Sequence, residues 1–258
     1  RHQATPKPPI PPIGFAATPR TVFVVSRATD YLPPHSSLPN GMWATRSPPG
    51  TPSMDRLTIL RDGIGKHSEV LEIGPYFNPI AARRDGYRVT TIDVFDTGAL
   101  QRRAAADPNL GPTRVPGIED VDLVGSACDL ADLTLAKYGP DKKFDWILSS
   151  HNFEHLPDPI RFLRQCAAVL GDTGTLRMAV PDKRFCFDHF RQISDISEWL
   201  QAFHERRTSP TVYQAFREEA HRSTLGADGR WTPVRQTLAF YRAWLGPDGV
   251  VPDGYIDT

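Results

Sequence analysis

The sequence predicts an α/β fold: a doubly wound, mostly parallel sheet with helices on both faces and a helical cap formed by the C-terminal part of the chain. Short apolar runs recur between residues 70 and 180, polar or glycine-containing segments follow them, and helix signals separate them. Strands that alternate with helices through short loops form βαβ units, and such units build a parallel sheet that is covered on both sides.

Composition bounds the class of protein. The chain has 258 residues, with 30 basic and 30 acidic side chains, and this length suits one α/β domain with accessory elements. Balanced charge gives no electrostatic reason to expect nucleic acid or an anionic membrane as partner. No apolar run approaches the ~20 residues that span a bilayer. We therefore expect neither a nucleic-acid nor a membrane partner.

Cysteine usage indicates the compartment. Cys128, Cys166 and Cys186 are scattered and include no CxxC pair. This usage predicts a reduced compartment, the cytoplasm, and argues against a thiolate zinc site. Because the chain begins without Met or a signal-type apolar core, we expect it to be part of a longer protein with an upstream or downstream domain.

Residues 1–52 are rich in proline. Each proline removes a backbone donor and restricts the residue before it, so this stretch cannot sustain a helix. We interpret it as a linker or tail, and the frayed end of an upstream domain is the alternative. Only the apolar run 21–25 is a candidate strand.

The first elements after this segment are a helix and a strand. Apolar residues recur at helical spacing from Met54 to Ile64, behind Ser53 as the N-cap. Residues 70–73 then form a short apolar run that ends at Gly74, as a buried parallel strand does.

Two capping signals predict helices that follow strands. Asn78-Pro79 and Asp158-Pro159 each place a capping residue before proline at the first helical position. After the second signal, one helical face is predicted at Ile160, Leu163, Ala167 and Leu170. The remaining strands are predicted over 88–92, 121–124, 144–148 and 175–180.

The strand rhythm stops after Asp182. Two amphipathic helix faces follow, one at Ile196, Trp199, Leu200 and Phe203 and the other at Val234, Leu238, Tyr241 and Leu245. We therefore predict a cofactor-binding domain over 53–190 and a helical lid on the substrate side over 191–258.

The chemistry is expected at the carboxyl ends of the strands, where open parallel sheets bind their ligands. The first strand is followed by a single glycine, Gly74, whereas a dinucleotide fingerprint requires GxGxxG. Tyr76 and Asn78 stand where further glycines would be. Asp93 ends the second strand, at the position where a carboxylate binds ribose hydroxyls in nucleoside-binding sheets.

In these segments the chain resembles the class I S-adenosylmethionine-dependent methyltransferases. The resemblance covers roughly residues 54–190 and implies a Rossmann-like sheet that binds S-adenosylmethionine. It rests on Val70-Leu71-Glu72-Ile73-Gly74, Ile92-Asp93, Cys128-Asp129-Leu130, the segment 144–151, and Glu154-His155-Leu156.

The resemblance implies a cofactor site spread over three strand ends. The loop at Gly74 passes under the methionine portion, Asp93 holds the ribose, and Asp129 lies near the adenine amino group. The predicted cofactor-binding residues are Glu72, Gly74, Pro75, Asn78, Asp93, Val94, Cys128, Asp129, Leu130, Ser150 and His151.

Two features depart from the family pattern. The loop keeps one glycine where the family usually has two or three. The family also completes its sheet with an antiparallel pair of strands. We find no candidate for that pair before Thr258, so we expect this chain to lack the final strands of the family fold.

The implied reaction needs an aligned acceptor, and positioning alone can supply ~7–11 kcal/mol. His151 is the first candidate for a base, because histidine titrates near neutral pH; packing against the cofactor is its alternative role. Asp182 is a second candidate, and Arg184 is a candidate to hold an anionic acceptor. Charged loop residues of this kind are also often simply solvated.

The acceptor is expected to be a small molecule or a saccharide. Phe185, Phe187, His189, Phe190, Trp199 and Phe203 offer aromatic surface suited to a sugar ring, and core packing is their alternative role. The resemblance to domains found beside glycosyltransferases favours a glycan. The predicted substrate contacts are His155, Arg184 and Phe187.

Two other functions are alternatives to methyl transfer. A cofactor-binding or structural module without catalysis would explain the depleted glycine loop. The segment 151–155 also spells HxxEH, the inverted zinc-protease signature. However, a strand runs into His151, and Pro157 and Pro159 break any helix after it, whereas zincins carry the motif inside a long helix. We therefore predict no metal ligands.

Overall fold

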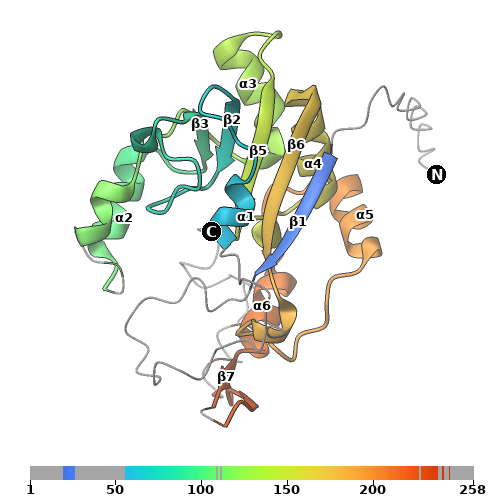
Figure 1. The fold of residues 1–258 in the computed structure, drawn as a ribbon. Coiled ribbons are helices and arrows are strands. Elements are labelled where there is room, and N and C mark those ends of the chain that lie inside the picture. The colour runs from blue at the N-terminus through green and yellow to red at the C-terminus, as the bar shows by residue number, and fades with distance from the viewer. Residues whose placement is uncertain are drawn as a thin grey trace, which may run out of the picture.

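A computed structural model describes residues 20–26 (backbone only), 56–108, 110, 112–226, 228–237, 240 and 244. Its centre is a six-stranded parallel sheet in the order β1-β6-β5-β2-β3-β4 (Figure 1). The strands are β1 (Arg20–Ser26), β2 (Glu69–Ile73), β3 (Arg88–Asp93), β4 (Leu123–Val124), β5 (Phe144–Ser150) and β6 (Leu170–Pro181). The helices are α1 (Arg56–Arg61), α2 (Thr97–Ala106), α3 (Leu130–Tyr138), α4 (Pro159–Val169), α5 (Ile196–Glu205) and α6 (Val212–Ala220).

The chain winds outward from β2 in two directions. It first runs through β3 to β4 at one edge, and then returns beside β2 as β5 and continues to β6. The topological switch point therefore lies between β2 and β5, where Val70 pairs with Trp146. This confirms the doubly wound sheet, and such a switch point opens a crevice at the carboxyl ends of the strands.

The core lies on both faces of the sheet, because successive side chains of a strand point to opposite sides. Leu71 packs in a buried cluster with Phe162 of α4 and Leu130 of α3. The neighbouring Val70 belongs to a second cluster with Leu60 of α1. Burial on both faces explains why the strands are continuous apolar runs.

The helix predicted after Asn78-Pro79 is wrong. An extended loop follows β2, and only one 3₁₀ turn, η2 (Arg83–Asp85), precedes β3. The backbone N–H groups of Ile80 and Ala81, which would open such a helix, donate instead to the buried carboxylate of Glu72. A side chain from the strand thus takes over the donors that a helix N-terminus leaves free.

The second capping signal is confirmed. Asp158 caps α4 by accepting a hydrogen bond from the N–H of Arg161 at 2.9 Å, and Pro159 is the first helical residue. The predicted apolar face was one position out of phase: Ala167 is exposed, and Leu170 already belongs to β6. The helix buries Pro159, Phe162, Cys166 and Val169.

A strand lies inside the proline-rich segment. β1 covers the apolar run that was the one candidate there, and it pairs in parallel with β6, with Arg20 beside Thr175 and Ser26 beside Pro181. Figure 1 shows β1 along the edge of the sheet. Ser53, Met54 and the helix residues Leu238, Tyr241 and Leu245 lie outside the described residues.

Accessory elements follow β6: α6 and β7 lie beyond its carboxyl end, whereas α5 lies beside the sheet and packs on α4 (Figure 1). In α5, Ile196 and Leu200 are exposed, while Trp199 packs edge-on against Phe153, so only part of the predicted face turns inward. After α6, β7 (Ser223–Leu225) and β8 (Trp231–Pro233) form a separate antiparallel pair that the sequence reading missed. Within the described ranges, no helix is both long and apolar enough to cross a membrane.

Candidate cofactor and acceptor site

The carboxyl ends of four neighbouring strands surround a pocket of about 800 Å³. It lies at the switch point between β2 and β5, and its volume is that of a small-molecule site. The lining residues are Ile73, Gly74, Tyr76, Ile92, Asp93, Val94, Phe95, Leu100, Arg103, Ala106, Asp107, Gly125, Ser126, Ala127, His151, Asn152, His155, Leu156, Pro157, Thr208, Ser209 and Pro210.

Glu72 holds the loop that follows β2. The residue is 1% exposed, and its two oxygens accept hydrogen bonds from the N–H groups of Ile80 at 2.6 Å and Ala81 at 2.9 Å. Burial raises the pKa of this carboxyl to about 7, and the two hydrogen bonds offset part of the rise. Glu72 does not line the pocket. Instead of contacting a ligand there, it fixes the path of the loop that does.

The loop after β2 keeps a left-handed backbone at two positions. Gly74 has a φ of +58° and Tyr76 a φ of +47°, a conformation that is uncommon for a residue with a Cβ. The Tyr76 ring lies 5.0 Å from the Phe77 ring and packs against the cluster beneath α2. Both left-handed residues line the pocket, whereas the predicted contacts Pro75 and Asn78 do not.

Asp93 ends β3 inside the pocket, beside Val94, so the structure brings both predicted residues to the site. Its Oδ1 accepts a hydrogen bond from the N–H of Phe95 at 3.1 Å. Burial raises the pKa of the Asp93 carboxyl, while Arg103 of α2 acts in the opposite direction. A half-buried carboxylate next to apolar wall can accept hydrogen bonds from hydroxyl groups of a ligand.

The turn after β4 reaches the pocket three residues earlier than predicted. Gly125, Ser126 and Ala127 line it, whereas Cys128 and Leu130 are buried in the core. Asp129 pairs with Arg161 of α4 and also lies outside the pocket. The prediction therefore found the correct turn, but the residues that line the pocket are the three that precede Cys128.

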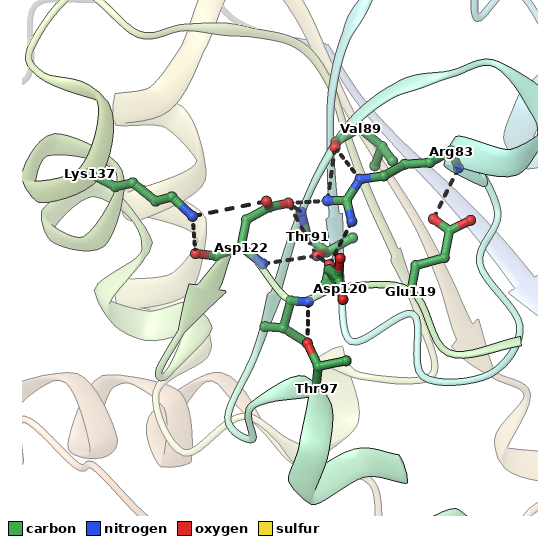
Figure 2. A network of polar contacts seen from close by, with 9 residues as sticks. Arg83, Val89, Thr91, Thr97, Glu119, Asp120, Asp122 and Lys137 are labelled. Atoms are coloured by element: carbon green, nitrogen blue, oxygen red, sulfur yellow. Dashed lines mark hydrogen bonds and ion pairs between the residues drawn. The ribbon is translucent and has the colours of Figure 1, made fainter. Parts of the chain in front are cut away.

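A polar network holds the short strand β4 in place (Figure 2). Asp122 accepts hydrogen bonds from the N–H of Thr91 at 2.8 Å and from Arg83. Arg83 also donates to the carbonyl oxygen of Asp120 at 2.7 Å, and Lys137 donates to the carbonyl oxygen of Asp122 at 2.6 Å. The two-residue strand is thus fixed to β3 by side chains as well as by its backbone.

His151 stands at the end of β5, on the other side of the switch point. Its φ is +53°, and its N–H donates to the carbonyl oxygen of Ala179 on β6 at 3.0 Å. The side chain is 10% exposed and lines the pocket. Asn152, which follows it, lies over Gly74: a Cβ placed on Gly74 would be 3.7 Å from the Asn152 amide nitrogen. Ser150, also predicted as a contact, does not line the pocket.

The HxxEH segment lacks the geometry of a zinc protease. His151 directly follows a strand, and Phe153–His155 form one 3₁₀ turn, η5, instead of a long α-helix. Among the residues that the structure describes, no group of three or more His, Cys, Asp or Glu is arranged to hold a metal. His155, the predicted substrate contact, does line the pocket.

Asp182, Arg184 and Phe187 lie outside the pocket lining. Asp182 caps the 3₁₀ turn after β6 and accepts hydrogen bonds from the Arg184 Nε at 2.9 Å and from its backbone N–H at 3.0 Å. The two side chains thus bind one another, and neither lines the pocket. Phe187 is 42% exposed beside the Arg222 guanidinium.

Two parts of the lining were missed by the sequence reading. One face of α2 contributes Leu100 and Arg103, and the C-cap residue Asp107 continues it; their helical spacing after Asp93 was the available signal. The segment 208–210, between α5 and α6, also lines the pocket. No pattern in the sequence marks this segment, because it is distant in the chain from the strand ends that it joins.

Comparison with known proteins identifies the family. The model of the family described as "Methyltransferase domain" matches residues 51–227, and no curated protein matches the chain. Solved structures with partial similarity include the CcbJ methyltransferase from Streptomyces caelestis, with 20% identity and a TM-score of 0.32, covering 46% of this chain and 45% of that one. An S-adenosylmethionine-dependent methyltransferase from Methanosarcina mazei has 25% identity and a TM-score of 0.31, with 46% and 54% covered.

A third solved structure, the glycopeptide N-methyltransferase MtfA, has 17% identity and a TM-score of 0.31, and the match covers 48% of this chain and 53% of that one. The chain thus spans about half of the length of these structures. The family match covers more than half of the chain and confirms both the predicted resemblance and S-adenosylmethionine as the cofactor. The chain belongs to the methyltransferase domain family.

Proposed function

We propose that this domain transfers a methyl group from S-adenosylmethionine to a small-molecule or saccharide acceptor. One observation carries the proposal: Gly74 follows β2, Asp93 ends β3 and His151 follows β5, and all three line one pocket at the switch point of the sheet. These residues differ in chemistry, and together they offer a close-approach turn, a carboxylate and an imidazole.

The residues present fit the cofactor in kind. The Asp93 carboxylate can accept the ribose hydroxyls, and Ile92, Val94 and Leu100 offer an apolar wall for the adenine ring. Gly74 leaves room for close approach because it has no Cβ. When bound, S-adenosylmethionine supplies a methyl group on a sulfonium, and transfer breaks that C–S bond with its electron pair left on sulfur.

The acceptor side is proposed to lie between His151, His155 and the segment 208–210, which all line the pocket. His151 takes the acceptor proton, since imidazole is a base near neutral pH. Outside the pocket lining, the partly buried rings of His189 and Trp231 stack at 4.9 Å. Aromatic surface of this kind suits a sugar or another flat acceptor.

The cofactor part is tested by calorimetric titration with S-adenosylmethionine and with its demethylated product. We expect binding by the full chain, and Asp93→Asn is expected to weaken it about 10- to 100-fold, because a hydrogen bond to a charged group is lost. Asp141→Asn is the matched control, since Asp141 is exposed at the opposite end of β5. Absence of binding at millimolar cofactor would overturn the proposal.

The transfer part is tested by incubation with methyl-labelled S-adenosylmethionine and a panel of glycans and small hydroxyl compounds. We expect label in at least one acceptor and loss of that label in His151→Gln. Tight binding without transfer to any compound would favour a cofactor-binding module without catalysis. Cytoplasmic location, the boundaries 53–190 and 191–258, and a further domain stay predictions.

A further inference from the structure

A carboxylate lies between the two histidines of the pocket. One oxygen of Glu154 is 3.6 Å from Nδ1 of His151 and 3.9 Å from Nε2 of His155. Both histidines line the pocket, whereas Glu154 does not. The Glu154 side chain is 27% exposed, against 10% for His151 and 47% for His155. Glu154 therefore lies within ion-pair distance of both imidazoles without lining the pocket itself.

The backbone that carries Glu154 is anchored from both sides. Within η5, the N–H of His155 donates to the carbonyl oxygen of Asn152 at 2.9 Å. The Phe153 ring packs 5.9 Å from Phe162 of α4 and 5.6 Å from Trp199 of α5. Two helices thus hold the turn, and the position of Glu154 does not depend on the histidines that it faces.

His151 is also restricted in how it can turn. Its backbone is left-handed, a strained conformation that persists only where surrounding structure maintains it, here the hydrogen bond to Ala179. Its Nδ1 is the ring nitrogen beside Glu154, at an ion-pair distance of 3.6 Å that is longer than a hydrogen bond, and Nε2 is the second ring nitrogen. A proton held on Nδ1 leaves the lone pair on Nε2, because a neutral imidazole carries one proton.

We infer that Glu154 is a positioning residue for His151: it selects the tautomer with the proton on Nδ1 and leaves Nε2 as the base for the acceptor. The inference rests on the proposed function, in which His151 takes that proton. The proton leaves the acceptor and binds Nε2, and the carboxylate of Glu154 offsets the positive charge that the ring then gains. An orienting acid behind a histidine base is a general arrangement in acid–base catalysis.

The test is spectroscopic and needs no acceptor. Long-range ¹H–¹⁵N correlation spectra of the full ¹⁵N-labelled chain report which ring nitrogen carries the proton, with His151 assigned from the signals missing in His151→Gln. At a pH where the ring is neutral, we expect the Nδ1–H tautomer in the wild type. Glu154→Ala is expected to shift His151 toward the Nε2–H tautomer, and Glu154→Asp to restore part of the original signal.

Glu69→Gln is the matched control. It removes a glutamate that is paired with Lys142 at 2.5 Å, at the amino end of β2, and is expected to leave the His151 signals unchanged. If Glu154→Ala does not fold, the isosteric Glu154→Gln replaces it, with a smaller expected shift. An Nε2–H tautomer in the wild type, or an unchanged tautomer in the folded variants, overturns the inference.

A kinetic readout follows once an acceptor is known. Glu154→Gln is expected to lower kcat about 10- to 100-fold, within the ~10²–10⁴-fold contribution of a general base, with cofactor affinity within twofold of the wild type. Failure of the proposed function would show differently: the cofactor would not bind, while the tautomer of His151 would still depend on Glu154.

Discussion

At position 76 the chain carries a tyrosine in a backbone conformation that glycine adopts most readily. The family pattern suggested that the missing glycine left the loop atypical. The structure shows that Tyr76 itself adopts the left-handed backbone conformation. Its ring packs against Phe77 and the cluster beneath α2. Sequence reasoning could not foresee this, because it reads the loss of glycine but not the packing that holds the residue in its place.

Glu72 makes stability depend on pH. Burial raises the pKa of Glu72 from 4.5 to about 7 in the folded state, so the native chain holds a proton that the unfolded chain has released between these values. Stability from this group is therefore greatest at low pH and falls as pH rises from about 5 through 7, by about 3 kcal/mol.

This pH dependence is measured by urea unfolding at pH 5 and pH 8. The glutamine of Glu72→Gln cannot titrate. As pH rises, the unfolding free energy of the wild type should therefore fall relative to that of the variant. The comparison of the two proteins cancels the titration of the histidines. Parallel pH curves for the two proteins would show that burial of Glu72 does not control this dependence.

Among the elements, β4 is the strand whose place depends most on side chains. It has two residues, and the network of Asp122 and Arg83 in Figure 2 joins it to β3 and to the preceding loop. The sequence predicted a strand over 121–124, but the Asp122 carboxylate turns to the Thr91 backbone, and the regular strand begins only at Leu123.

Asp122→Ala is expected to destabilise the chain by about 1–3 kcal/mol, because it leaves the Arg83 guanidinium and the N–H of Thr91 without this partner. The Gly125 amide, which donates to the carbonyl oxygen of Asp93 at 2.8 Å, should exchange its hydrogen faster. Since Gly125 also lines the pocket, cofactor affinity should fall as well. Hydrogen exchange and calorimetry measure both effects, with Asp141→Asn as control; unchanged exchange at Gly125 would argue against the network as the support of β4.

The type of each element was easier to predict than its exact ends or than the residues that form the buried face of a helix. The strands at 70–73, 88–92 and 144–148 were found because burial on both faces makes them continuous apolar runs. The helix after Asn78-Pro79 was not formed, because Glu72 binds its first donors from a distance of eight residues. Such a contact leaves no local signal in the sequence.

The site was predictable at the same coarse level. Residues at strand ends, Gly74, Asp93 and His151, do meet in one pocket, because topology alone brings the carboxyl ends together. Asp182 and Arg184 do not join them, and their side chains bind each other instead. The segment 208–210 was missed, since it is distant in the chain from the strand ends that it joins.

At the scale of the whole molecule, β1 is the unexpected strand of the central sheet. It covers the edge of β6 from within a segment interpreted as a linker, and an uncovered strand edge invites pairing with other chains. A chain that starts at residue 51 is therefore expected to melt about 5–10 °C lower and to aggregate more readily. A chain that starts at residue 20 keeps β1 and serves as control, with thermal unfolding and light scattering as readouts; equal behaviour of the two would argue against a stabilising role for β1.

The pairing of β1 with β6 also sets an order of events during synthesis. β1 leaves the ribosome before the other described strands, yet its partner positions, Thr175 to Pro181, are translated only after the four strands β2 to β5. Contacts so distant in sequence form slowly, because a long loop must close before they contribute. The nascent chain therefore carries an apolar strand without its neighbour while β2 to β5 are translated, and this interval is where a chaperone would act on it.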